Sequence, residues 1–154
     1  NPVAKSTRLR MRPTLADPLR PAHVHPRRMP REALTAPGAA RVGPYSHGVR
    51  AGELVFLSGQ TPVDPATGRL REGGAGSQAD QCLTNLFAVL AADGLGPEDV
   101  VKVNVYLVDM ADFAEMNAAY ARRFAEPYPA RTTVGVSALP LGARIEMELV
   151  ARRT

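Results

Sequence analysis

The chain has 154 residues, of which 45% are hydrophobic and 22% charged, as expected for one globular domain with a single core. No apolar run approaches the roughly 20 residues that a membrane-spanning helix needs, and residues 1–32 lack the apolar core of a signal peptide, so we expect neither membrane association nor secretion. The single cysteine, Cys82, excludes an internal disulfide and a cysteine-rich zinc site, which fits the cytoplasmic location that we expect.

The net charge of +4 is divided unevenly along the chain. Residues 1–32 hold eight Lys/Arg against two acidic residues, a balance of +6, together with six of the 14 prolines. Residues 33–154 hold 11 basic and 13 acidic residues, a balance of −2. We therefore predict a basic, proline-rich, flexible extension (1–32) followed by a mildly acidic domain (33–154) that is not suited to nucleic acid. The extension is either an electrostatic arm for nucleic acid or an anionic membrane, or a segment without such a role: a solvated extension, a targeting remnant, or sequence translated upstream of the true start. We favour the second interpretation.

The domain begins with short strand and turn signals. The apolar run Leu54–Leu57, which ends at Ser58-Gly59, predicts a strand. The segment Asp64–Gly68 is typical of a turn, and Gly73–Gly76 is typical of a flexible loop.

A first helix is predicted between Ser77 and Gly94. Ser77 with Asp80 three residues later resembles a capping arrangement, and Gly94 favours termination. Between them, apolar side chains recur at helical spacing: Ala79, Cys82, Leu83, Leu86, Phe87 and Leu90. Because Cys82 belongs to this stripe, we interpret it as a buried, inert thiol.

A strand and a second helix follow. The segment 100–108 predicts a strand whose apolar face holds Val101, Val103, Val105 and Leu107. Asp109 or Asp112 then begins a helix with Phe113, Met116, Asn117, Tyr120 and Phe124 on one stripe. Asn117 is unusual there, because a buried amide without partners costs roughly 1–3 kcal/mol.

Two further strands, at 132–137 and 144–151, complete an α+β pattern with the helices gathered on one face of the sheet. Their alternation predicts that four polar side chains face away from the helices: Arg131, Thr133, Glu146 and Glu148. That second face is either solvated, with ion pairs that contribute little each, or covered by another subunit.

Six motifs resemble, in order, those of the RidA (YjgF) family. The motifs are Gly43–Ser46, Phe56–Gln60, Asp64–Gly68, Asn117–Tyr120, Pro129–Val134 and Ile145–Glu148, and the resemblance as a whole covers roughly residues 34–152 without a large gap. The resemblance implies a chorismate-mutase-like α+β domain, with a mixed sheet and two helices packed on one face. It also implies a homotrimer with active sites between subunits. The implied activity is hydrolysis of reactive 2-imino acids, or enamine tautomers such as 2-aminoacrylate, to 2-keto acids and ammonia, which limits metabolite damage without a cofactor or metal.

The resemblance also implies roles for individual residues. Arg131 matches the arginine that pairs with the substrate carboxylate, and Glu146 matches the glutamate associated with the hydrolytic water. We expect Arg131, Glu146 and Tyr45 to be catalytic, and the substrate-binding set to be Ser58, Gly59, Asn117 and Thr133. Thr133 departs from the family pattern, since many members have cysteine there, and this questions substrate preference more than activity. His47 is interpreted as a solvent or rim residue.

Three other functions stay open on the sequence. The same cleft can serve a non-catalytic ligand-binding or regulatory trimer, or a family member specialised to a biosynthetic pathway. RNA binding or cleavage is also attributed to this family, but the acidic domain disfavours it.

Overall fold

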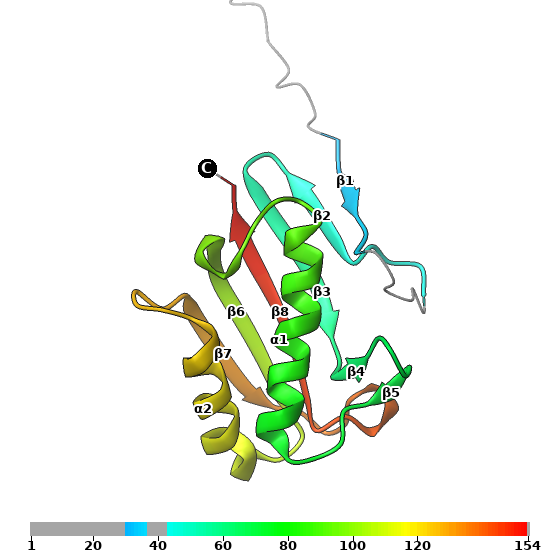
Figure 1. Cartoon of the computed structure of the whole chain (residues 1–154), viewed down its shortest axis with the longest axis vertical. Helices are drawn as coiled ribbons and strands as arrows, with labels where there is room; N and C mark the ends of the chain where they lie inside the picture. Colours follow the sequence, from blue (N-terminus) through cyan, green and yellow to red (C-terminus); the bar gives the residue numbers. More distant parts are fainter. Residues whose placement is uncertain (1–29, 37–42, 154) are drawn as a thin grey trace, which may run out of the picture.

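The computed structural model describes residues 30–36 and 43–153, which form a sheet covered on one face by two helices (Figure 1). Strand β1 begins at Glu32, the last residue of the predicted extension. The rest of that extension lies almost entirely outside the described residues. None of the helices in the described part of the chain is long and apolar enough to cross a bilayer.

Six strands of the described residues form one mixed sheet in the order β1–β2–β3–β8–β6–β7. Strands β6 and β7 pair in parallel, and the other neighbours pair antiparallel. The bounds are β1 Glu32–Leu34, β2 Gly48–Ala51, β3 Leu54–Gln60, β6 Val100–Leu107, β7 Ala130–Gly135 and β8 Ile145–Arg152. A separate hairpin, formed by β4 (Val63–Asp64) and β5 (Arg69–Leu70), contains the predicted turn.

Helix α1 (Ala75–Ala91) packs its predicted apolar stripe onto the sheet. Of the stripe, Phe87 alone is only partly buried, and Cys82 is fully buried, as predicted. The predicted start at Ser77 was wrong, because the helix begins at Ala75 after Gly74. The free backbone N–H of Gly76 in the first turn donates instead to Glu115 of the second helix, at 3.2 Å.

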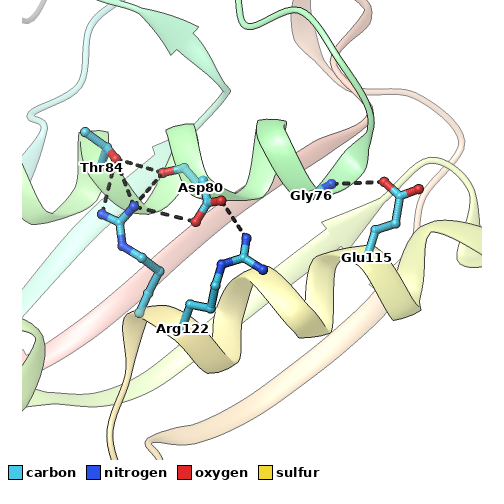
Figure 2. A network of polar contacts seen from close by, with 6 residues as sticks. Gly76, Asp80, Thr84, Glu115 and Arg122 are labelled. Atoms are coloured by element: carbon cyan, nitrogen blue, oxygen red, sulfur yellow. Dashed lines mark hydrogen bonds and ion pairs between the residues drawn. The ribbon is translucent and has the colours of Figure 1, made fainter.

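The second helix, α2 (Phe113–Arg123), is held beside α1 by polar contacts along its length (Figure 2). At one end Glu115 accepts from Gly76, and at the other Arg122 pairs with Asp80 at 2.8 Å. Arg123 adds a bond of 3.2 Å to the hydroxyl of Thr84. Exposed pairs contribute little individually, but together these contacts fix the position of α2 along α1.

The start of α2 is preceded by a short 3-10 turn, η2 (Met110–Asp112), which uses both predicted aspartates. Asp109 caps the turn by accepting from the backbone of Ala111 at 2.8 Å. Asp112 accepts from Nε of Arg144 at 3.0 Å, which joins the start of α2 to the start of β8. Two further 3-10 turns are η1 (Pro97–Asp99) and η3 (Pro140–Gly142).

Strand β6 differs from the prediction at its first residues. The pairing with β8 is irregular between Val100 and Lys102, so Val100 is buried and Val101 is 43% exposed. An extra residue in one strand reverses the alternation locally. The predicted inward position of Val101 was therefore wrong, whereas those of Val103, Val105 and Leu107 are confirmed.

Candidate functional site between an edge strand and the open sheet face

Arg131 and Thr133 lie on the edge strand β7, and they face the helices. In the parallel register Arg131 is the partner of Val103 and Thr133 is the partner of Val105, both of which are fully buried in the core. The prediction that these two residues face away from the helices was therefore wrong. An edge strand has a neighbouring strand on one side only, so polar residues can occur on both of its faces. The alternation of polar and apolar residues is therefore a poor guide to which face points toward the core. On β7 the side chain of Val134 points away from the helices and is 40% exposed.

The Arg131 guanidinium is held in place by α2. Its Nη2 donates to Oδ1 of Asn117 at 2.9 Å, and its Cζ lies 4.6 Å from the ring centroid of Tyr120 and 5.7 Å from that of Phe113. Asn117 is exposed, so its amide does not carry the cost expected of a buried group. Nε and Nη1 of Arg131 make no hydrogen bond to residues 30–36 or 43–153, which leaves donors available on an oriented guanidinium.

Two hydroxyls in this region lack partners within the described residues, those of Tyr120 and Thr133. The Tyr120 side chain is buried, and burial raises its pKa to about 12, against the opposing charge of Arg131. Its phenol is therefore neutral at physiological pH. We refer to Arg131, Thr133, Asn117, Tyr120 and Phe113 as the arginine group.

Glu146 lies on β8 and faces the open side of the sheet, because its neighbour Met147 is fully buried toward the helices. A Cβ placed on Gly59 would overlap the Glu146 carboxylate, so that carboxylate lies directly against the backbone of β3. A larger residue at position 59 would displace the carboxylate end of the Glu146 side chain. Burial is the first cause that raises the pKa of Glu146, and the charge of Glu148 is the second.

Ser58 lies on β3 next to Gly59, and Tyr45 lies in the loop before β2. The Ser58 hydroxyl donates to the Ser46 carbonyl at 2.7 Å, and the Ser58 N–H donates to the His47 carbonyl at 2.9 Å. The Tyr45 ring, 42% exposed, lies 6.3 Å from that of His47. His47 is only 3% exposed, so its interpretation as a rim residue was wrong. We refer to Tyr45, Ser58, Gly59 and Glu146 as the glutamate group.

The structure thus places the predicted site residues in two groups within one chain. The arginine group lies on the helix-covered face, at the β7 edge, whereas the Glu146 carboxylate of the glutamate group lies against Gly59 on the open face. Strand β6 separates β7 from β8 in the sheet. Sequence reasoning did not assign Tyr120 and Phe113 to the site, because helical periodicity placed both in an apolar stripe. Periodicity does not show that the Arg131 guanidinium lies over their rings.

Comparison with known proteins identifies the class to which this fold and these residues belong. The family described as "Endoribonuclease L-PSP" matches residues 34–153. The chain belongs to this family, the RidA/YjgF family. The resemblance stated from the six motifs is therefore confirmed, and so is the predicted fold.

Individual relatives carry several names. The chain is 49% identical over 119 residues to the RutC family protein y4sK of Sinorhizobium fredii, covering 77% of this chain and 93% of the relative. It is 42% identical over 117 residues to the 2-iminobutanoate/2-iminopropanoate deaminase of Bos taurus, covering 76% and 85%. The crystal structure of RidA from the Antarctic bacterium Psychrobacter sp. PAMC 21119 superposes with a TM-score of 0.75 at 43% identity, covering 79% of this chain and 99% of the other.

Proposed function

We propose that this protein hydrolyses 2-imino acids, or their enamine tautomers such as 2-aminoacrylate, to 2-keto acids and ammonium. The observation that carries the proposal is the Arg131 guanidinium, which Asn117 and Tyr120 orient while Nε and Nη1 stay unused. The names of relatives such as the Bos taurus deaminase support the same reaction class.

Arg131 suits a substrate that carries a carboxylate next to the reacting carbon. A planar guanidinium binds a carboxylate through two parallel hydrogen bonds, which fixes the adjacent C=N bond in one orientation. A backbone amide such as that of Gly59, or the Thr133 hydroxyl, which has no partner among the described residues, supplies a further donor at the cleft. The Ser58 hydroxyl already donates to the Ser46 carbonyl, so it serves the substrate as an acceptor. Holding the reactants in this way supplies much of the rate enhancement when the substrate is already electrophilic.

Glu146 suits the proton transfers of the reaction. Water attacks the protonated imine carbon, a C–O bond forms, and the proton lost by the water passes to the Glu146 carboxylate. Glu146 then gives this proton to the nitrogen, and the C–N bond breaks as the C=O bond forms and ammonia departs. Glu146 takes the hydroxyl proton and passes it to the ammonia, so that iminium and water become keto acid and ammonium with Glu146 restored as carboxylate. Tyr45 is exposed in the loop before β2, and we assign it the role of closing the cleft or donating to the substrate nitrogen.

The complete site requires two copies of the chain. The arginine and glutamate groups lie on different faces of one sheet, so a substrate held by Arg131 meets the Glu146 of a neighbouring copy. The open face also exposes apolar side chains such as Phe56, at 45%, and Val134, at 40%, which favours its burial between subunits. We propose the homotrimer that the family resemblance implies, with one site at each interface.

A trapping assay tests the proposed activity directly. An amino-acid oxidase generates the imino acid, semicarbazide traps it, and the purified protein competes for it. We expect substoichiometric protein to lower the semicarbazone yield while keto acid and ammonium rise in equal amounts. A fall limited to one imino acid per site would instead indicate a non-catalytic binding protein. A profile over imines from several amino acids would show whether the protein is specialised to one of them.

A further inference from the structure

The open face of the sheet carries a polar network beside Glu146 that the proposed reaction leaves unused. On β6, Asn104 is the partner of Glu148 and Tyr106 is the partner of Glu146 in the antiparallel register. The Nδ2 of Asn104 and the hydroxyl of Tyr106 both donate to Oε1 of Glu148, at 2.9 and 2.8 Å. All four side chains are half-buried.

Tyr106 reaches diagonally between the two carboxylates. Its backbone is opposite Glu146, but its hydroxyl bonds to Glu148, the next residue on the same face of β8. Diagonal neighbours are within reach of an aromatic side chain. The bond to Glu148 is the first cause that raises the pKa of Tyr106, so the phenol keeps its proton and acts as the donor.

The two carboxylates are therefore held differently. Glu148 receives two hydrogen bonds, whereas Glu146 accepts none from the residues that the structure describes. Two positions along a strand separate side chains by about 7 Å, a distance at which like charges still repel each other. The two donors hold the Glu148 carboxylate in place, and Glu148 is the second cause, after burial, that raises the pKa of Glu146.

We propose that Asn104 and Tyr106 are positioning residues that act on Glu146 through Glu148, which they hold as a fixed negative neighbour. Glu146 exchanges the proton that hydrolysis moves from water to nitrogen, and Glu148 stays in a fixed position beside it. The inference rests on the proposed function, since it assigns how the carboxyl group of that site is kept ready for proton transfer.

The other groups near Glu146 do not supply the negative charge that Glu148 places beside it. Gly59 of β3 offers only its backbone. Cys82 of α1 lies behind β8, with its thiol 3.8 Å from the Ile145 carbonyl, and burial raises its pKa, so it stays neutral. Glu148 and Tyr106 are therefore the titratable groups of the described residues that share the open face with Glu146 on neighbouring strand positions.

The variant Glu148→Gln tests the inference, because it removes the charge and keeps an oxygen that accepts from Asn104 and Tyr106. Without the neighbouring charge Glu146 ionises more easily, so the acid limb of the kcat/KM profile should move to lower pH by on the order of half a unit to one unit. The matched control is Glu53→Gln, which removes an exposed carboxylate in the turn between β2 and β3 and should leave the limb in place. An unmoved limb in Glu148→Gln overturns the inference.

A second variant tests whether Tyr106 acts through Glu148. Tyr106→Phe keeps the ring and removes the donor, and it should lower kcat several-fold in the wild-type background with little change in KM. In the Glu148→Gln background the same substitution should have no further effect, since residues in one network are not additive. Independent, multiplying losses in the double variant contradict the assignment.

A carboxyl titration separates this inference from the proposed function. ¹³C NMR of the Glu146 side chain in the wild type and in Glu148→Gln reports the coupling without any substrate. A titration that moves to lower pH in a protein without turnover refutes the proposed function and keeps the inference on the carboxylate pair. A titration that does not move refutes the inference even in an active enzyme.

Discussion

The arginine group and the glutamate group hold their charged side chains in different ways. Arg131 lies at an open edge of the sheet and is oriented by side chains of a helix, through a hydrogen bond to Asn117 and the face of Tyr120. Glu146 lies on a strand with neighbours on both sides and is placed by the backbone of Gly59. The arginine group therefore holds a permanent positive charge in a fixed orientation, and the glutamate group holds a carboxyl group that can accept and release a proton. In the proposed reaction the arginine group binds the substrate carboxylate, and the glutamate group transfers the proton.

The largest effect is expected at Arg131. Arg131→Ala should lower kcat/KM by about 10³, mostly through KM, because truncating one partner of a hydrogen-bonded charge pair costs roughly 2–5 kcal/mol. Steady-state kinetics on imino acids measure this loss. Arg131→Lys is the control that keeps the charge without the planar fork, and it should recover only part of the affinity. Full activity in Arg131→Ala would remove this residue from the site.

The variant Glu146→Gln tests the proton-transfer role of the glutamate group. Losing a proton-transfer group costs about 10² in kcat, while KM stays close to the wild-type value because the arginine group is untouched. Single-turnover measurements at saturating imino acid check the split. If Glu146→Gln raised KM as strongly as Arg131→Ala does, the division between binding and proton transfer would be wrong.

A smaller loss is expected when the backbone beside Glu146 is crowded. Gly59→Ala places a methyl group where the Glu146 carboxylate lies, and the carboxylate must move. We expect kcat to fall about tenfold, as misplacement of a proton-transfer group predicts. Gly76→Ala is a matched control in α1, where the new methyl meets its nearest neighbour, the Glu115 carbonyl, at an ordinary 3.5 Å. Equal kinetics for both variants would contradict the role of the Gly59 contact.

The smallest effect concerns stability and pH. The pKa of Glu146 is raised above its ordinary value of 4.5 in the folded protein, so the folded state binds this proton more tightly than the unfolded state. Stability from this group is present at low pH and is lost as the pH rises through the folded-state pKa. Glu146→Gln should therefore melt about 1–3 °C higher than the wild type at pH 8, with no such advantage at pH 4. A melting difference that does not vary with pH would contradict the shifted pKa.

The sequence predicted both helices and the strands β3, β6, β7 and β8, but it did not predict β1 or β2, and it was less reliable for the facing of individual side chains. The stripe from Ala79 to Leu90 determined α1 because a covered helix has a single buried face. Arg131 was assigned to the wrong face of the sheet. Pairing with β6 decides which side chains of β7 point toward the helices, and alternation along β7 does not show this. The place of Tyr106 depends on the register of β6 against β8, which brings together residues 42 positions apart.

The central claim, that each site joins the arginine group of one copy to the glutamate group of another, is tested by mixing two inactive variants. Arg131→Ala and Glu146→Gln chains are co-refolded in equal amounts, and subunit exchange is verified by native mass spectrometry. Random assembly leaves about a quarter of the interfaces with both groups intact, so about a quarter of wild-type activity should return. A mixture that exchanges subunits and stays as inactive as its parents would show that the two groups do not form one site across copies.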